Sequence, residues 1–130
     1  MLTRVFYISE IAASCTDIDI KMILGTAHVN NRRLDVTGML AKSDGHFGQV
    51  LEGRTDVMPG LLAKIQADWR HGAVRMLLQD SIETRQFPNW SMGLIQREDM
   101  AEEMRLAHHD GCANLALARH LIRKLMAREP

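Results

Sequence analysis

The stretch VTGMLAKSDGHFGQVLE, residues 36–52, consists of two apolar runs separated by the turn sequence Ser43-Asp44-Gly45. An Asp-Gly pair between two such runs is a strong hairpin signal, because both residues accept the backbone angles of a tight turn. We therefore predict strands over residues 36–42 and 46–52, joined as a β-hairpin.

A strand and a helix are predicted before this hairpin. Residues 3–9 (TRVFYIS) are rich in β-branched and aromatic side chains, which favour a strand. Thr16 and Asp17 are typical first residues of a helix, and the helix is expected to end near Asn30-Asn31. Between these signals, apolar residues recur on one helical face: Ile20, Ile23, Leu24 and Ala27.

A second helix and two more strands are predicted after the hairpin. Residues 53–56 end the hairpin and are expected to cap a helix with Pro59 in its first turn, where proline is tolerated. Strands are expected over residues 73–79 and 90–96. The order β-α-β-β-α-β-β predicts a ferredoxin-like α+β sandwich, with a five-stranded mixed sheet and two helices on one face.

The last part of the chain differs from this pattern. Residues 98–110 are rich in acidic side chains, and residues 112–128 have helical periodicity. We therefore divide the chain into a core domain over residues 1–97 and a C-terminal helical extension over residues 98–130, packed on or near the sheet.

Composition excludes several classes of protein. The 130 residues include 16 Lys and Arg against 16 Asp and Glu, so no overall positive field attracts nucleic acid. The apolar runs are too short to cross a bilayer, and the N-terminus lacks the core of a signal peptide. We expect a cytoplasmic protein that binds neither membrane nor nucleic acid.

Two polar side chains are expected on the inner sheet face. In a ferredoxin-like fold the first and third strands are central neighbours, and alternate residues point to the same side. If that side faces the helices, Tyr7 and Gln49 lie next to each other, and leaving either unpaired would cost about 1–3 kcal/mol. Two interpretations follow: a satisfied Tyr-Gln pair in the core, or a pair that contacts a bound ligand.

Other polar residues also have two interpretations. Asn30 and Asn31 either end the first helix or bind the edge of a heterocycle, because each amide both donates and accepts. Lys64 and Arg70 either belong to an ordinary surface or hold a phosphate. The cluster His108-His109, Cys112 and His120 lacks a known metal-ligand spacing, so we interpret it as a polar helix surface and expect no metal site.

Together, five blocks of sequence resemble the BLUF family, the sensors of blue light using FAD. The resemblance covers residues 3–96 and rests on these blocks: Tyr7-Ile8-Ser9; Asn30-Asn31 with Val36-Thr37-Gly38-Met39-Leu40; Phe47-Gly48-Gln49-Val50-Leu51-Glu52-Gly53; Asp68-Trp69-Arg70-His71; and Trp90-Ser91-Met92. It implies that residues 1–97 form a flavin-binding domain that holds the isoalloxazine ring of FAD between the two helices.

The resemblance also implies a role for individual residues. Tyr7 is expected to give an electron and then a proton to the excited flavin, and Gln49 to lie between that phenol and the ring. Trp90 and Met92 match the last-strand pair that rearranges near Gln49. The other residues expected to bind FAD are Ile23, Asn30, Asn31, Lys64, Ile65, Asp68, Arg70 and His71.

The resemblance therefore implies a photoreceptor without net catalysis. We expect it to pass its signal to a separate protein partner or to an oligomer of itself, and we expect a homo-oligomer. The competing hypothesis is a flavin-free small-ligand-binding module or an enzyme on the same ferredoxin-like fold, because a fold alone does not fix function. The exposed aromatic platform of an RNA-binding module is missing.

Overall fold

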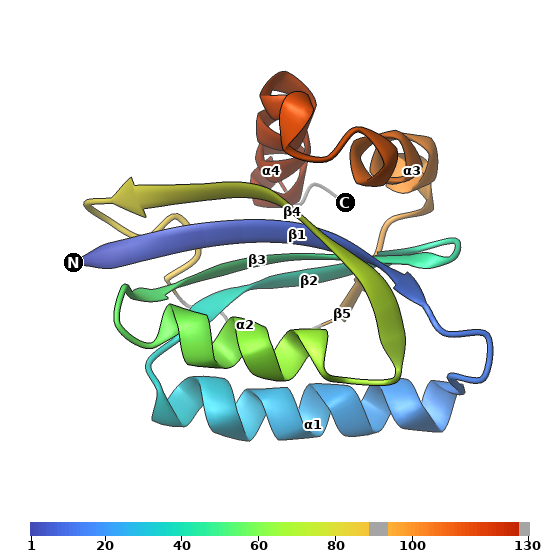
Figure 1. The fold of residues 1–130 in the computed structure, drawn as a ribbon, viewed down its shortest axis with the longest axis horizontal. Coiled ribbons are helices and arrows are strands. Elements are labelled where there is room, and N and C mark those ends of the chain that lie inside the picture. Colours follow the sequence, from blue (N-terminus) through green and yellow to red (C-terminus); the bar gives the residue numbers. More distant parts are fainter. Residues whose placement is uncertain (89–93, 128–130) are drawn as a thin grey trace.

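The computed structural model describes residues 1–88 and 94–127. In chain order its elements are β1 (Leu2–Ile11), α1 (Asp17–Arg33), β2 (Thr37–Ser43), β3 (His46–Arg54), α2 (Met58–Gln66), β4 (His71–Ile82), β5 (Leu94–Gln96), the 3-10 turn η1 (Glu98–Met100), α3 (Ala101–Asp110), the 3-10 turn η2 (Gly111–Ala113) and α4 (Leu115–Ala127). Figure 1 shows these elements as a layered structure with the sheet in the middle.

The five strands form one mixed sheet in the order β4-β1-β3-β2-β5. The pairs β1–β3, β1–β4 and β2–β3 are antiparallel, whereas β2 and β5 are parallel. The predicted ferredoxin-like sandwich is therefore confirmed, with β1 and β3 as central neighbours. The predicted last strand began at residue 90; the structure has β5 from Leu94, and residues 89–93 lie outside the described part.

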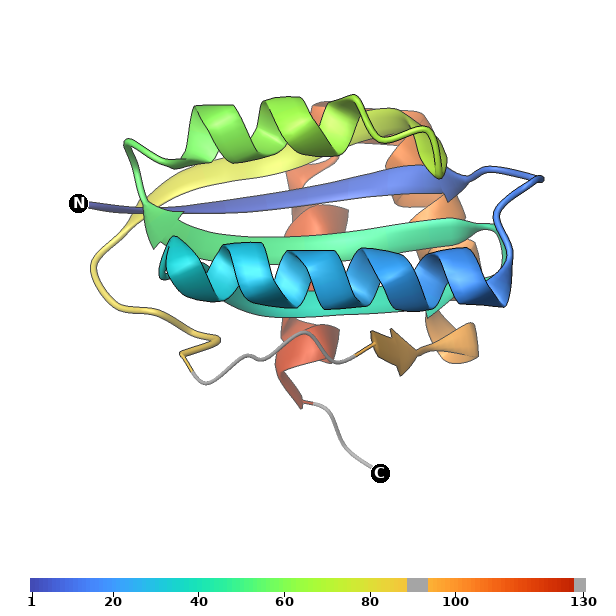
Figure 2. The same ribbon diagram turned by 90° about the horizontal axis from the view of Figure 1, so that it is seen from below.

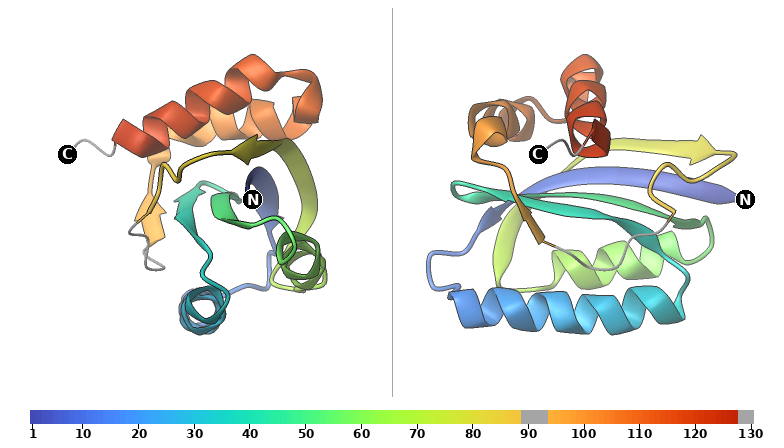
Figure 3. Two further views of the ribbon diagram at one scale, coloured as in Figure 1. Left: turned by 90° about the vertical axis from the view of Figure 1, so that its left-hand side faces the viewer. Right: turned by 180° about the vertical axis from the view of Figure 1, so that it is seen from behind.

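Helices cover both faces of this sheet. α1 and α2 lie side by side along one face, as Figure 2 shows from below, and α3 and α4 cover the other (Figures 1 and 3). Residues 3–9 of β1 are consequently all buried. This explains why the middle of β1, residues 5–8, does not alternate between polar and apolar residues.

Local sequence signals determine where the first helix begins and where the hairpin turns. The hydroxyl of Thr16 accepts from the backbone N–H of Asp19, while the Asp19 carboxylate accepts from that of Thr16, which is a complete capping box. Gly45 in the β2–β3 turn has a φ of +78°, a conformation that favours glycine.

The predicted cap of the second helix is wrong. α2 begins at Met58 with Val57 as its N-cap, and no side chain caps it. Residues 53–56 were expected to cap this helix, but the carboxylate of Asp56, the residue before Val57, is bound by the Arg54 guanidinium through two hydrogen bonds. Pro59 does lie in the first turn, as predicted.

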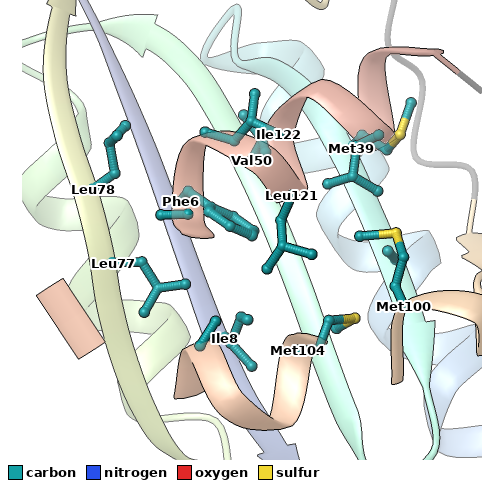
Figure 4. Close-up of a cluster of buried hydrophobic side chains, with 14 of the residues drawn as sticks. Phe6, Ile8, Met39, Val50, Leu77, Leu78, Met100, Met104, Leu121 and Ile122 are labelled. Carbon is teal, nitrogen blue, oxygen red and sulfur yellow. The ribbon is translucent and has the colours of Figure 1, made fainter. Parts of the chain in front are cut away.

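The hydrophobic core between the sheet and the C-terminal helices is shown in Figure 4. Phe6, Ile8 and Val50 project from the sheet, and Met104 and Leu121 meet them from α3 and α4. Leu121 is fully buried. The C-terminal helices therefore share one core with the strands.

Gly48 leaves a space on the outer sheet face that a side chain of α3 fills. A Cβ atom at Gly48 would lie 2.9 Å from the terminal methyl carbon of Met104, so the methionine side chain occupies the space that a side chain on β3 would take. Gly48 is the direct sequence neighbour of Gln49, which lies on the opposite face of the strand. Two adjacent residues of β3 therefore face opposite layers of the structure: Gly48 faces α3, and Gln49 faces the side of α1 and α2.

A buried ion pair holds the segment that follows β4. Glu52 has no exposed surface and accepts from Arg4 Nε at 3.0 Å. Its carboxylate also accepts from the backbone N–H groups of Gln86 and Phe87. Glu52 thus compensates for its own burial and anchors the connection between β4 and β5.

In residues 1–88 and 94–127, no helix is long and apolar enough to cross a membrane.

Candidate functional site

A cavity of about 450 Å³ lies between the inner sheet face and the helices α1 and α2. Its floor includes Tyr7 from β1 and Gln49 from β3, and its side walls come from the two helices. The volume lies within the range of small-molecule sites, which are mostly apolar with a few polar groups at fixed positions.

Tyr7 and Gln49 form the polar centre of the floor. They are direct partners in the antiparallel β1–β3 register, and both are at least 95% buried. The Tyr7 hydroxyl donates a short hydrogen bond to Gln49 Oε1. Burial raises the pKa of the Tyr7 phenol, and the negative charge of Asp68 raises it further, so the phenol is neutral at physiological pH.

The walls are apolar with two amides at one end. Ile23 from α1 and Ile65 from α2 line the cavity from its two helical sides. Asn30 and Asn31 line it from the last turn of α1, and Asn31 is buried. Flat apolar walls with carboxamides fit a planar heterocycle whose edge both donates and accepts hydrogen bonds.

Charged groups lie where α2 leads into β4. Asp68 accepts from Arg70 Nε at 2.8 Å and from Arg70 Nη2 at 2.7 Å, and also from the Arg70 backbone N–H. The Arg70 guanidinium holds the pKa of the Asp68 carboxyl below its usual value. Lys64 also lines the cavity and is exposed to solvent. This side of the cavity thus offers cationic side chains to an anionic group.

His71 joins the sheet to α2 beside the cavity. Its Nε2 lies 2.8 Å from the carbonyl oxygen of Ile65, and its Nδ1 lies 2.6 Å from the hydroxyl of Ser9. Because a carbonyl only accepts, Nε2 carries the proton and donates to Ile65. His71 therefore fixes the end of α2 against β1, next to Tyr7.

The structure brings the described candidate residues together. Every one of them lines the same cavity: Tyr7, Ile23, Asn30, Asn31, Gln49, Lys64, Ile65, Asp68, Arg70 and His71. Trp90 and Met92 fall outside the described residues, so the structure does not test them. Trp69 is 61% exposed and is absent from the cavity lining.

Sequence reasoning missed part of the lining. Phe47 and Leu51, two residues to either side of Gln49 on β3, line the cavity but were not selected as site residues, because apolar side chains resemble ordinary core. Arg33 from the end of α1 also lines the cavity and was not anticipated. Its position on the cavity side of α1, one helical turn after Asn30, was the available signal.

Comparison with known proteins decides the family. The profile described as "Sensors of blue-light using FAD" matches residues 2–93. The chain belongs to the BLUF family. It is a flavin-binding blue-light sensor domain, and all the residues that line the cavity fall within the matched region.

A photosensor protein is among the relatives of this BLUF domain. The photoactivated adenylate cyclase subunit beta of Euglena longa is 35% identical over 101 residues, which cover 77% of this chain. The chain spans 12% of the length of that subunit.

Solved structures agree with this assignment. BlrB, a BLUF protein in its dark state, has a TM-score of 0.82 at 27% identity and covers 98% of this chain and 97% of its own. Klebsiella pneumoniae BlrP1 with FMN and cyclic diGMP has a TM-score of 0.71 at 28% identity, covering 98% of this chain and 35% of its own.

The residues of this BLUF domain fit a flavin. An isoalloxazine ring is flat and apolar over most of its area, and one edge carries carbonyl and N–H groups. Ile23 and Ile65 supply apolar walls, while Asn31 and Gln49 supply amides that match both kinds of edge group.

Proposed function

We propose that this protein is a blue-light photoreceptor that binds FAD non-covalently in the cavity and uses Tyr7 and Gln49 to convert absorption into a changed hydrogen-bond network. The observation that carries the proposal is the Tyr7–Gln49 hydrogen bond on the cavity floor. When bound, the flavin supplies the absorption of blue light and the acceptance of an electron.

Tyr7 is suited to be the electron donor. It is the only tyrosine of the chain, and its phenol is neutral and lies in the cavity. A phenol that loses an electron becomes strongly acidic, so it needs a proton acceptor within hydrogen-bonding distance. Gln49 Oε1 is in that position. When electron and proton return to Tyr7, nothing has been consumed and the cycle has no net reaction.

The Gln49 side chain is suited to maintain the hydrogen-bond network that forms after light absorption. Its amide carries a carbonyl at one end and an NH₂ group at the other, so rotation or tautomerisation changes which groups it donates to and accepts from. The changed bonding at the ring edge gives a red-shifted, long-lived signalling state. Asn30, Asn31, Ile23 and Ile65 hold the ring in our proposal.

The phosphate side of FAD is assigned to the charged end of the cavity. Lys64 is exposed, and we propose that it binds a phosphate directly. Asp68, Arg70 and His71 form the fixed turn that supports this side.

The signal is proposed to reach the C-terminal helices through Trp90 and Met92 and the last strand. β5 is followed by Arg97, whose backbone N–H donates to the carbonyl of Lys42 on β2. The Arg97 guanidinium donates to the Lys124 carbonyl of α4 at 3.2 Å. A displacement of β5 would therefore act on α4 through the Arg97 side chain, among other contacts. A separate protein or a second copy of the chain then receives the signal.

Self-association has a candidate surface on α1. Ile18, Met22 and Val29 are 60–70% exposed and lie on one side of the helix, and none of them lines the cavity. The first turn of α1 carries Asp17, and its last turn carries Arg32. Two copies packed antiparallel through this side would bury the apolar residues and pair opposite charges. We therefore propose a homo-oligomer formed through α1.

Absorption spectroscopy of the purified protein tests the proposed function. We expect a yellow protein that releases FAD on denaturation, and whose flavin band moves to the red under blue light and returns in the dark. Release of FMN instead would overturn the choice of FAD. A colourless preparation that takes up neither flavin would overturn the proposal and favour the flavin-free binding module.

A further inference from the structure

Three metal-ligating side chains meet at one end of the sheet, outside the cavity. Glu10 near the end of β1 and His46 at the start of β3 are direct cross-strand partners, and His108 reaches them from α3. One ligand atom from each residue lies within 4.8 Å of the other two.

The two imidazoles lie at a separation that suits a shared metal ion. Their ring centroids are 5.3 Å apart, and their planes are inclined by 55°. With Zn–N bonds of about 2.0–2.1 Å and tetrahedral angles, two imidazoles on one zinc have centroids about 5 Å apart. The separation of the His46 and His108 rings is therefore compatible with one shared ion.

Backbone carbonyls orient both rings. His108 Nε2 lies 2.6 Å from the carbonyl oxygen of Ala73, so this nitrogen carries the proton and Nδ1 has a lone pair to offer. His46 Nδ1 makes a longer contact of 3.4 Å with the Asp44 carbonyl, and when Nδ1 donates there, Nε2 has the lone pair to offer. A hydrogen bond from the second ring nitrogen to a carbonyl is the usual support of a metal-binding histidine.

We infer that Glu10, His46 and His108 form a binding site for a divalent transition metal, best matched by Zn²⁺. Two neutral imidazoles and one carboxylate are typical zinc ligands, whereas Ca²⁺ and Mg²⁺ prefer oxygen ligands alone. Glu10 is exposed and both histidines are half-buried, so water completes the tetrahedron. The ion bridges the sheet and α3.

This set differs from the histidine cluster considered in the sequence. His109 contacts Asp110, His120 contacts Glu103 at 2.6 Å, and Cys112 is exposed, so these residues do not converge with His108. The residues of the proposed site lie far apart in the sequence, on β1, β3 and α3. For this reason no spacing rule could detect them.

Titration of Zn²⁺ into the metal-free, full-length protein tests the site by calorimetry. We expect saturable binding of one equivalent, an increase in the thermal unfolding temperature with zinc, and at least a tenfold loss of affinity in H46Q and H108Q. H109Q is the matched control, because His109 is adjacent to His108, is exposed and lies outside the set. Its affinity should equal that of the unmodified protein.

Three results would overturn the inference: no one-equivalent binding, unchanged affinity in H46Q and H108Q, or an equal loss in H109Q. Far-ultraviolet circular dichroism establishes that each variant is folded. Should the histidine variants fail to fold, E10Q replaces an exposed ligand at little structural cost and is expected to bind zinc several-fold more weakly; unchanged binding by E10Q would then contradict the site.

Discussion

Tyr7 and Gln49 are direct cross-strand partners on the two central strands, and the phenol donates to the amide oxygen on the floor of the cavity. Their positions follow from the register of β1 and β3, so the sheet itself holds donor and acceptor together. Such a pair is positioned before any ligand binds, which reduces the reorganisation that its chemistry requires.

The raised pKa of Tyr7 predicts a resistance to alkaline titration. An unfolded tyrosine loses its proton near pH 10, whereas burial and Asp68 keep the folded phenol protonated at higher pH. The folded state then binds more protons than the unfolded state, so this contribution to stability is complete below pH 10 and is lost as pH rises above it. Because Tyr7 is the only tyrosine, tyrosinate absorbance reports on it alone. We expect that absorbance to rise together with unfolding; titration near pH 10 in the folded protein would contradict the burial of the phenol.

Removal of the buried carboxylate should be strongly destabilising. Glu52→Ala leaves Arg4 buried without its partner and removes the acceptor of the Gln86 and Phe87 N–H groups. We expect the free energy of unfolding in urea to fall by about 3–5 kcal/mol. Glu83→Ala, at an exposed position beyond β4, is the control and should change it by less than about 0.5 kcal/mol. Equal effects of the two substitutions would show that Glu52 does not anchor this segment.

Arg97→Gln should separate the photocycle from the output. It removes the guanidinium that donates to the Lys124 carbonyl of α4 but leaves the cavity intact. We expect a normal light-induced spectral shift, and loss of the light-dependent change in amide hydrogen exchange within α4. Arg105→Gln removes an exposed ion pair of α3 and should retain both responses. A full α4 response in Arg97→Gln would refute this route.

Met22→Glu should weaken self-association through α1. It places a charge at the middle of the exposed apolar side that we propose as the contact between two copies. We expect the mass measured by light scattering to fall to that of a monomer, with flavin binding retained. Gln66→Glu introduces the same side chain at an exposed position of α2 and should leave the mass unchanged. A purely monomeric unmodified protein would itself exclude the proposed contact.

The sequence predicted the fold well because its strongest signals are local. The Asp44-Gly45 turn and the Thr16 cap each depend on residues that are close together in the sequence. The structure has a hairpin at the first position and a capping box at the second. The alternation along β1 and β3 also predicted that Tyr7 and Gln49 share a face. The predicted cap of α2 by residues 53–56 was wrong: the N-cap is Val57, and the Asp56 carboxylate is bound by Arg54 instead.

Contacts between residues far apart in the chain could not be predicted from the sequence. Nothing in the local sequence indicates that Met104 fills the space above Gly48, or that Glu52 binds the backbone of Gln86. The meeting of Glu10, His46 and His108 likewise depends on where α3 packs. Such contacts are set by the tertiary arrangement of elements that are distant in the chain.

The light-minus-dark absorption spectrum of Tyr7→Phe, compared with Gln49→Leu and with the control Gln79→Leu, tests the central claim most directly. Gln79 lies on β4 and is exposed, so its substitution should leave the spectrum normal. We predict that Tyr7→Phe and Gln49→Leu still bind flavin but lose the long-lived red shift, because one lacks the donor and the other the acceptor. A normal, reversible red shift in either variant would contradict the account.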